Sequence, residues 1–312
     1  MNPQPLPKAG PDLPGTERAS DAATDLPALS TRDLLELING QDASVATAVR
    51  REVPAVERAV DAVVERLRQG GRLILLGAGT SGRLAVMEAA EARPTFGMPA
   101  TTVIGLMAGG PSAMTGSREG AEDDVEAAIE DIRRLALTVR DTVVGVSASG
   151  RTPFVIAAVR AAHAQGALTI GLCCDDPAPL SEAVAIAIHP TVGPEVIAGS
   201  TRLKAGTAQK LVLNMLTTAV MIRLGRIHGN LMIDVQATNA KLRDRARRIV
   251  EEVTGRAGPA VEEALAESGW SARVAIVMLG RQVDASEARR LIAHGPPFSE
   301  LVGAARAEGL HD

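Results

Sequence analysis

Two stretches of the chain combine glycine with hydroxyl-bearing residues, a combination suited to binding a phosphate group. They are Gly77-Ala78-Gly79-Thr80-Ser81-Gly82-Arg83 and Ser147-Ala148-Ser149-Gly150-Arg151-Thr152. Each follows a short apolar run and precedes a helical pattern, so backbone amides, hydroxyls and the positive end of a helix meet there. We therefore predict a phosphate monoester site. The residues predicted to contact the phosphate are Thr80, Ser81, Gly82, Ser147, Ser149 and Thr152.

Two other interpretations of these loops stay open. By spacing, Gly77, Gly79 and Gly82 also match the dinucleotide-binding pattern G-x-G-x-x-G. That pattern needs a carboxylate at the end of the second strand for the ribose hydroxyl, and residues 105–110 contain none. Alternatively, the hydroxyls only cap two helices. Two loops of one kind after two strands of one sheet favour phosphate binding over both.

The elements that must position these loops are short apolar runs alternating with helical patterns such as Glu122–Thr138 and Pro153–Ala164. Each apolar run is unbroken rather than alternating, which is typical of parallel strands covered on both faces. The pattern predicts an open, doubly wound α/β sheet of five mostly parallel strands, with ligands at the carboxyl ends of the strands. The predicted strands are residues 73–76, 103–107, 142–146, 168–172 and 183–188.

Helical patterns flank the predicted sheet on both sides. Ser30 suits the start of a first helix, and Pro54 suits the first turn of a second. After residue 225, a long polar helix over Asn239–Thr254 precedes a small three-helix unit over residues 258–267, 272–278 and 284–294. The chain thus divides into a Pro-rich disordered leader (1–15), a helical segment (16–70), an α/β domain that carries the two phosphate loops (71–225) and a helical region (226–312).

Composition argues against several classes of protein. Aromatic residues make up 1% and the net charge is −4, which disfavours nucleic-acid binding. We find neither a signal peptide nor an apolar run approaching the roughly 18 residues of a membrane span, so we expect a cytoplasmic protein without a membrane partner. Adjacent Cys173 and Cys174 fit small core residues at a strand end, and the five histidines lack metal-ligand spacing. We predict no metal and no cofactor.

Several further blocks, in order, make the sequence recognisable: residues 119–123, 193–196, 199–214, 229–232 and 237–239. With the two loops, they resemble the sugar isomerase (SIS) family of phosphosugar-binding domains and, within it, the N-acetylmuramic acid 6-phosphate etherases. The resemblance runs from about Thr16 to the end. It implies a lyase of cell-wall sugar recycling that converts its substrate to N-acetylglucosamine 6-phosphate and D-lactate, and a homodimer.

The resemblance also implies two catalytic glutamates, Glu91 and Glu122. Cleaving the lactyl ether requires removal of the C2 hydrogen, which the C1 aldehyde acidifies, and protonation of the leaving lactyl oxygen; positioned carboxyl groups can do both. The resemblance favours Glu91 as the proton donor, but the assignment of acid and base stays open. Residues 92–94 read Ala-Arg-Pro where Cys-Pro-Pro is usual. Sugar contacts are implied for Glu195, Ser200 and Lys204.

Three rival functions remain. An aldose–ketose isomerase on the same domain would share the phosphate loops without needing Glu91 and Glu122. A sugar-sensing regulator resembling the glucokinase regulatory protein would carry two such domains in a longer chain, whereas this chain has one set of loops. A phosphosugar-responsive transcription factor needs a basic helix-turn-helix, and residues 31–68 are mixed in charge.

The spacing along the chain finally suggests a site shared between subunits. If the helix that begins near Ser81 is continuous, Glu91 lies about 15 Å along it from the first phosphate loop. A second subunit can bring its own Glu91 to that loop. The apolar residues between Leu211 and Leu224 offer surface for such a dimer.

Overall fold

The computed structural model describes residue 13 and residues 15–20, 25–116, 118–296 and 298–307. The predicted leader, 1–15, therefore lies outside the described residues except for Leu13 and Gly15. The chain divides into two compact units. The first, here the sheet unit, comprises residues up to Ala90 and Thr101–Thr218; the second, the helical unit, comprises Glu91–Ala100 and residues from Ala219 onward.

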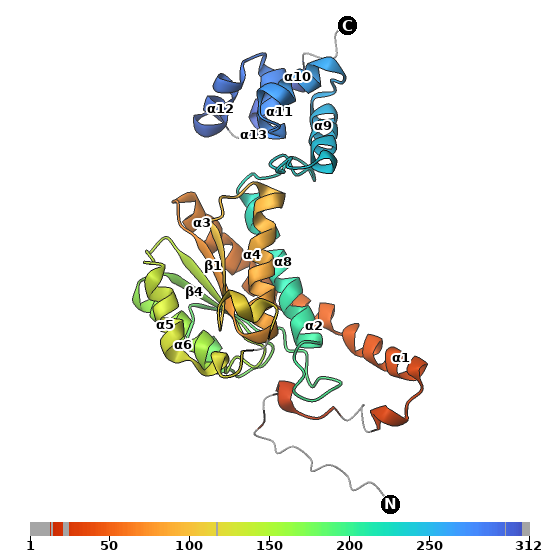
Figure 1. The fold of residues 1–312 in the computed structure, drawn as a ribbon, viewed down its shortest axis with the longest axis vertical. Coiled ribbons are helices and arrows are strands. Elements are labelled where there is room, and N and C mark those ends of the chain that lie inside the picture. The colour runs from red at the N-terminus through yellow and green to blue at the C-terminus, as the bar shows by residue number, and fades with distance from the viewer. Residues whose placement is uncertain (1–12, 14, 21–24, 117, 297, 308–312) are drawn as a thin grey trace, which may run out of the picture. The chain divides into compact units, whose positions relative to one another are not determined.

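Five parallel strands form the sheet of the first unit, in the order β2-β1-β3-β4-β5 (Figure 1). This confirms the predicted doubly wound α/β fold. The fifth strand is shorter than predicted, because residues 183–185 form the turn that follows the short helix α7, Pro179–Glu182. The strands are β1 Leu73–Gly77, β2 Val103–Met107, β3 Thr142–Val146, β4 Leu168–Leu172 and β5 Ile186–Ile188.

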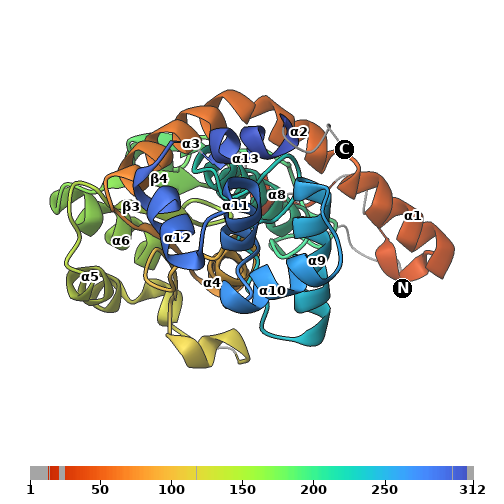
Figure 2. The ribbon, with the colours of Figure 1, turned by 90° about the horizontal axis from the view of Figure 1, so that it is seen from above.

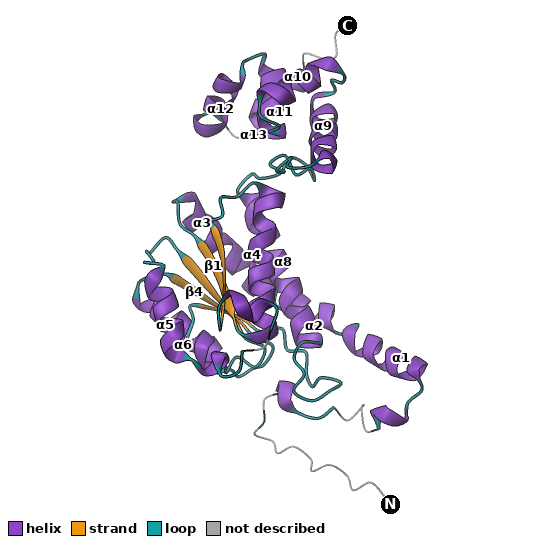
Figure 3. Cartoon of the chain, viewed as in Figure 1, coloured by secondary structure: helices purple, strands orange, loops and turns teal. Residues whose placement is uncertain are grey.

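Helices cover the sheet, as the purple ribbons beside the orange strands of Figure 3 show. Helix α5 (Val125–Arg134) and α6 (Pro153–Ala164) lie side by side in Figures 1 and 2 and bury Ile132 and Phe154 against Ile74 and Val143. Helix α4 (Gly79–Phe96) follows β1 and α8 (Lys204–Arg223) follows β5. Short 3-10 turns complete the unit: η1 Gly15–Glu17, η2 Leu26–Ala28, η3 Pro111–Met114 and η4 Ala121–Asp123.

The segment before the sheet contains three helices where two were predicted: α1 Thr31–Asp42, α2 Val45–Arg51 and α3 Val53–Arg68. The predicted starts are confirmed, since the Ser30 hydroxyl accepts the Asp33 N–H and Pro54 lies in the first turn of α3. The extra break follows α1, where the Ser44 hydroxyl donates to the Gln41 carbonyl at 2.7 Å. Such side-chain bonds to the backbone compete with helix continuation.

The helical unit has its own aliphatic core. Helix α11 (Ala272–Arg281) packs against α9 (Ala240–Thr254), α10 (Pro259–Glu267), α12 (Ala285–His294) and α13 (Phe298–Ala307). The predicted three-helix unit is incomplete, because α13 was missed although Leu301 and Val302 join the buried cluster. Among the described residues, no helix is both long enough and apolar enough to cross a membrane.

Candidate functional site

The loop after β1 is held tightly enough that two of its positions accept only glycine. A Cβ on Gly82 would come within 2.6 Å of the Gly77 carbonyl oxygen, and one on Gly77 within 2.8 Å of the Gly82 nitrogen. Gly79 has a φ of +53°, a left-handed conformation that glycine adopts without strain. Helix α4 begins at this residue, so Thr80 and Ser81 occupy its first turn.

Helix α8 covers that first turn. The buried Ser81 hydroxyl donates a hydrogen bond to Oε1 of Gln209, at 2.9 Å. One turn earlier on α8, a Cβ on Gly206 would lie 3.6 Å from Cγ2 of Thr80. The predicted phosphate loop thus packs against α8. No local sequence pattern predicts this contact.

In the loop after β3, the hydroxyls bond to one another rather than to the helix that follows. Ser147 Oγ and Thr152 Oγ1 lie 2.8 Å apart, and the Ser149 hydroxyl accepts the Arg151 N–H at 3.3 Å. Thr152 occupies the N-cap position of α6, yet its side chain makes no capping bond. Side-chain capping therefore does not explain the hydroxyl of Thr152.

The acidic residues Glu122, Asp123 and Asp124, which follow β2, lie in different local structures. The predicted helix over Glu122–Thr138 is wrong at its start, because Glu122 lies in the separate turn η4 and α5 begins only at Val125. The reason is a cap: Asp124 Oδ1 accepts the Ala127 N–H at 2.9 Å and starts α5 there. The Glu122 side chain is left exposed.

Glu122 lines a cavity of about 310 Å³ at the carboxyl ends of β1 and β2, together with Ala78, Gly79 and Arg83 of the first predicted phosphate loop. The residues of this loop predicted to contact phosphate, Thr80, Ser81 and Gly82, are not among the lining residues. The Arg83 guanidinium holds its wall by donating to the backbone carbonyls of Ala113 and Gly116, both at 3.0 Å, and of Met114 at 3.2 Å. These bonds tie the segment after β2 to the first turns of α4. The structure thus brings a carboxylate from one loop to the glycine-rich turn of another.

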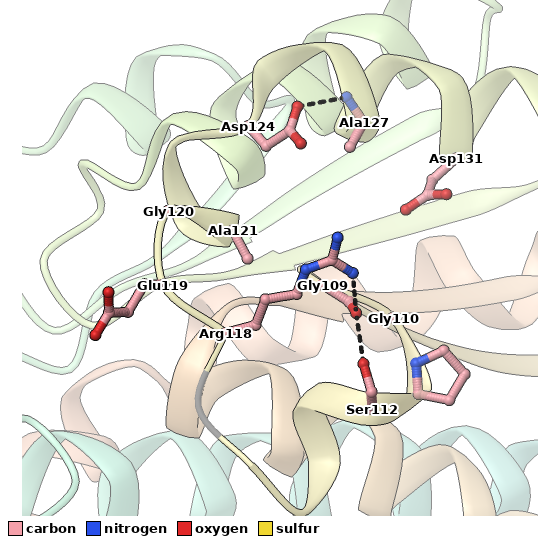
Figure 4. A pocket seen from close by; sticks show the side chains of 11 residues that line it. Gly109, Gly110, Ser112, Arg118, Glu119, Gly120, Ala121, Asp124, Ala127 and Asp131 are labelled. Carbon is pink, nitrogen blue, oxygen red and sulfur yellow. Dashed lines mark hydrogen bonds between the residues drawn. The ribbon is translucent and has the colours of Figure 1, made fainter.

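A wider depression of about 630 Å³ adjoins this cavity and shares Arg118 with it. Figure 4 shows the Arg118 guanidinium and the Ser112 hydroxyl both bonded to the Gly109 carbonyl, at 3.2 and 3.3 Å. The Asp131 carboxyl of α5 lines the same depression, and burial raises the pKa of this carboxyl. One wall of the depression is therefore cationic and another acidic.

Glu91, the other predicted catalytic residue, lies exposed on α4 and belongs to the helical unit. Helix α4 is continuous from Gly79 to Phe96 and includes Pro94. One turn before Glu91, the buried Glu88 carboxylate accepts hydrogen bonds from Lys210 Nζ and Thr217 Oγ1 of α8, both at 2.5 Å. No local sequence pattern predicts this cluster, because Glu88 lies 122 and 129 positions away from its two partners.

The three predicted sugar-contact residues gather at the start of α8. The fully buried Glu195 carboxylate accepts the N–H groups of Lys204 and Ala205, at 3.0 and 2.9 Å. Lys204 donates through Nζ to Gln41 Oε1 of α1 at 2.9 Å, and burial lowers the pKa of this amine. Ser200 is half-buried just before the helix. In this structure, Glu195 and Lys204 bond to the protein itself.

Among the described residues, no group of three or more His, Cys, Asp or Glu side chains is arranged to hold a metal ion. The two cysteines are buried and unpaired, as expected for core residues at the end of β4.

Two family models match overlapping parts of the chain. The glucokinase regulatory protein N-terminal SIS domain matches residues 55–163, and the SIS domain matches residues 123–219. Among solved structures, a phosphoheptose isomerase from Neisseria gonorrhoeae is 19% identical with a TM-score of 0.49, covering 61% of this chain and 98% of its own.

Curated relatives are much more similar in sequence. The chain is 54% identical over 280 residues to the N-acetylmuramic acid 6-phosphate etherase of Rubrobacter xylanophilus, covering 90% of this chain and 93% of the relative. Relatives with the same name from Caldanaerobacter subterraneus and Yersinia pestis are 48% and 50% identical. They cover 89% and 88% of this chain and 90% and 93% of their own lengths.

Proposed function

Because the chain belongs to the N-acetylmuramic acid 6-phosphate etherase family, we propose that it cleaves the lactyl ether of N-acetylmuramic acid 6-phosphate. The products are N-acetylglucosamine 6-phosphate and D-lactate. The observation that carries this proposal is the 48–54% identity to etherases over about nine tenths of the chain. The cavity that joins Glu122 to the glycine-rich turn after β1 supports it within this chain.

In this proposal the 6-phosphate binds between the two hydroxyl loops. Thr80, Ser81 and Gly82 begin α4, and Ser149 and Thr152 precede α6, so two helix N-termini and several hydroxyl-bearing residues lie at one edge of a parallel sheet. A phosphate monoester carries about two negative charges at neutral pH. Helix N-termini and hydroxyl donors both stabilise such a charge.

The reaction proceeds by elimination followed by addition of water. In the open-chain sugar the C1 aldehyde acidifies the C2 hydrogen; a carboxylate removes this proton as the C3–oxygen bond breaks, and the lactyl oxygen takes a proton from a carboxylic acid. Water then adds at C3 while a proton returns to C2. We assign the proton donation to Glu91 and the proton removal to Glu122.

A direct assay tests this function. Purified protein incubated with N-acetylmuramic acid 6-phosphate should release D-lactate and N-acetylglucosamine 6-phosphate in equal amounts. In deuterated, ¹⁸O-labelled water, deuterium should enter C2 of the sugar and ¹⁸O should enter C3, while the lactate oxygens remain unlabelled. Labelled lactate would contradict elimination. Substrate binding without D-lactate release would instead favour a sugar-sensing regulatory protein. Interconversion of an aldose phosphate and a ketose phosphate would favour an isomerase.

The same proposal covers assembly and compartment. We place the reaction in the cytoplasm, where a charged sugar phosphate is retained because its charge opposes passage through the membrane. We propose a homodimer in which Glu91 of one subunit serves the phosphate loops of the other. Ten residues of helix separate Ser81 from Glu91, about 15 Å. Exposed apolar side chains, including Met87 and Leu211, offer surface for association.

A further inference from the structure

Gln209 is buried on α8 with both N–H donors of its side-chain amide unused. Its side chain is 1% exposed, and its Oε1 accepts the Ser81 hydroxyl. Its Nε2, although buried, has no hydrogen-bond partner among the described residues. An unpaired buried amide nitrogen is unfavourable and uncommon in folded proteins, so its presence beside a binding loop requires an explanation.

The direction of the existing bond matters for anion binding. A serine hydroxyl has one proton to donate, and here Ser81 donates it to Gln209. A phosphate oxygen at neutral pH needs a donor. To bind phosphate, Ser81 must turn its proton toward the ligand, and its own oxygen then faces Gln209 Oε1. Two acceptors would meet at the 2.9 Å that separates these atoms.

We propose that Gln209 is a positioning residue that switches the Ser81 hydroxyl between two hydrogen-bonding states. When phosphate binds, the amide turns by about half a revolution around its Cγ–Cδ bond, a torsion that is broad and nearly two-fold. Nε2 then donates to Ser81 Oγ, and Ser81 donates to the phosphate. A neutral amide suits this role because it presents both a donor and an acceptor. The inference rests on the proposed phosphate site and identifies what sets the donor direction within it.

Titration calorimetry with inorganic phosphate tests the inference without relying on turnover. Gln209→Met, similar in length but unable to hydrogen-bond, should weaken phosphate binding about tenfold. Ser81→Ala should weaken it by a similar factor. The double variant should bind no more weakly than Ser81→Ala, because Gln209 acts only through that hydroxyl.

A second variant gives a pH signature that a purely structural residue would lack. In Gln209→Glu the introduced carboxyl is buried, which raises its pKa. Protonated, it can donate to Ser81 Oγ as the amide does; ionised, it only accepts and also repels the phosphate. Phosphate affinity relative to the wild type at the same pH should therefore approach unity near pH 5 and fall at least tenfold by pH 8. A ratio that does not change with pH would overturn the inference.

A matched control and the remaining outcomes keep the test decisive. Gln165→Met removes another side-chain amide, whose Oε1 accepts the Leu137 N–H at 3.0 Å, and should leave phosphate binding unchanged. Wild-type affinity in Gln209→Met, or a full additional loss in the double variant, refutes the role of Gln209 while leaving the phosphate site intact. If Ser81→Ala binds phosphate with wild-type affinity, Ser81 does not contact the phosphate and both the proposed phosphate site and the role of Gln209 are refuted.

Discussion

Neighbouring acidic residues in the loop after β2 have separate tasks. Asp124 is committed to capping α5, whereas Glu122, two residues earlier, lines the cavity beside the glycine-rich turn. Two carboxylates two positions apart are distinguished here because Asp124 accepts the backbone N–H of Ala127, whereas Glu122 makes no such bond within the described residues. Glu122 alone of the pair is free of a structural bond within the described residues, which suits a group that must exchange protons.

We expect Glu122→Gln to reduce kcat by about 10²–10⁴-fold, because the amide cannot transfer the proton that elimination requires. The KM and the unfolding midpoint should change little, since Glu122 is exposed. Asp123→Asn is the matched control, one residue away in the same turn and absent from the cavity lining. Equal effects of the two substitutions on kcat would argue against the assignment.

Removal of the Ser149 hydroxyl should weaken substrate binding by about 1–3 kcal/mol, the range for losing a bond to a charged group. The measurement is the dissociation constant of N-acetylmuramic acid 6-phosphate for the Ser149→Ala protein. Thr207→Ala provides the control, because within the described residues that hydroxyl donates only to the carbonyl of Leu203, the residue just before α8. The unphosphorylated sugar should bind poorly to all three proteins. Wild-type affinity in Ser149→Ala would exclude this hydroxyl from the phosphate site.

At the scale of elements, polar clusters fix the helices and strands that carry the site. Glu88, Lys210 and Thr217 join α4 to α8, the helix that also backs the first phosphate loop. At the other end of the sheet, Arg72 precedes β1 and Asp141 precedes β3, and the two form an ion pair at 2.8 Å. Both clusters pair a buried carboxylate with a partly exposed cation, so removing one partner leaves the carboxylate charge poorly compensated.

Thr217→Val should lower the free energy of unfolding by about 1–3 kcal/mol, because the near-isosteric change removes a donor from the buried Glu88 carboxylate. Urea titration followed by circular dichroism measures this difference. Thr218→Val, at an exposed position of the same helix, should change stability far less. If both variants unfold at the same urea concentration, the cluster does not stabilise the contact between the helices.

The Arg72–Asp141 pair predicts a stability contribution that acid removes. Burial opposes ionisation of Asp141, but hydrogen bonds from Arg72 and from the Thr138 and Arg72 backbone prevail and lower the pKa of this carboxyl. A lowered folded pKa means that the contribution is present above the unfolded value, about 3.9, and is lost as pH falls through the folded value.

Asp141→Asn should therefore be clearly less stable than the wild type at pH 7, and the difference should narrow below about pH 4. Urea unfolding of both proteins between pH 2.5 and 7 measures this trend. A constant difference over the whole range would mean that the charge of Asp141 does not contribute. Because a surface pair such as Arg32–Glu36 is largely solvated, Glu36→Gln should show little pH-dependent difference.

At the scale of the whole molecule, the proposed dimer predicts that two inactive variants restore activity when their subunits are combined. Glu91→Gln subunits and Ser81→Ala/Ser149→Ala subunits should each be nearly inactive at substrate concentrations below KM. If Glu91 acts across the interface, a mixed dimer contains one intact site. An equimolar mixture after subunit exchange should then recover about a quarter of wild-type activity. No recovery, with exchange proven by mass spectrometry, would place Glu91 and the loops of one site in the same subunit.

The sequence by itself determined the five-stranded parallel sheet, most of its helices and the family. The signals that predicted these elements are local: unbroken apolar runs for the strands, Ser30 as a helix cap, and Pro54 in a first turn. The structure contains each of these features, because local signals act on the segment in which they occur. The family was likewise identified from the sequence, because the blocks that resemble it are long and occur in the same order. The predicted roles of the site residues all remain predictions: catalysis by Glu91 and Glu122, phosphate binding by the two hydroxyl loops, and sugar contacts by Glu195, Ser200 and Lys204.

Tertiary structure decided which of these residues meet. The bond between Ser81 and Gln209 joins positions 128 apart, and Glu88 reaches Thr217 across 129. Glu122 lies outside the helix predicted for it, because Asp124 caps α5 and the helix begins after that residue. Periodicity reports only which face of an element is apolar, whereas a hydrogen bond between distant residues depends on how helices pack. The direction in which Ser81 donates its proton is therefore a property of the fold and cannot be found in either loop alone.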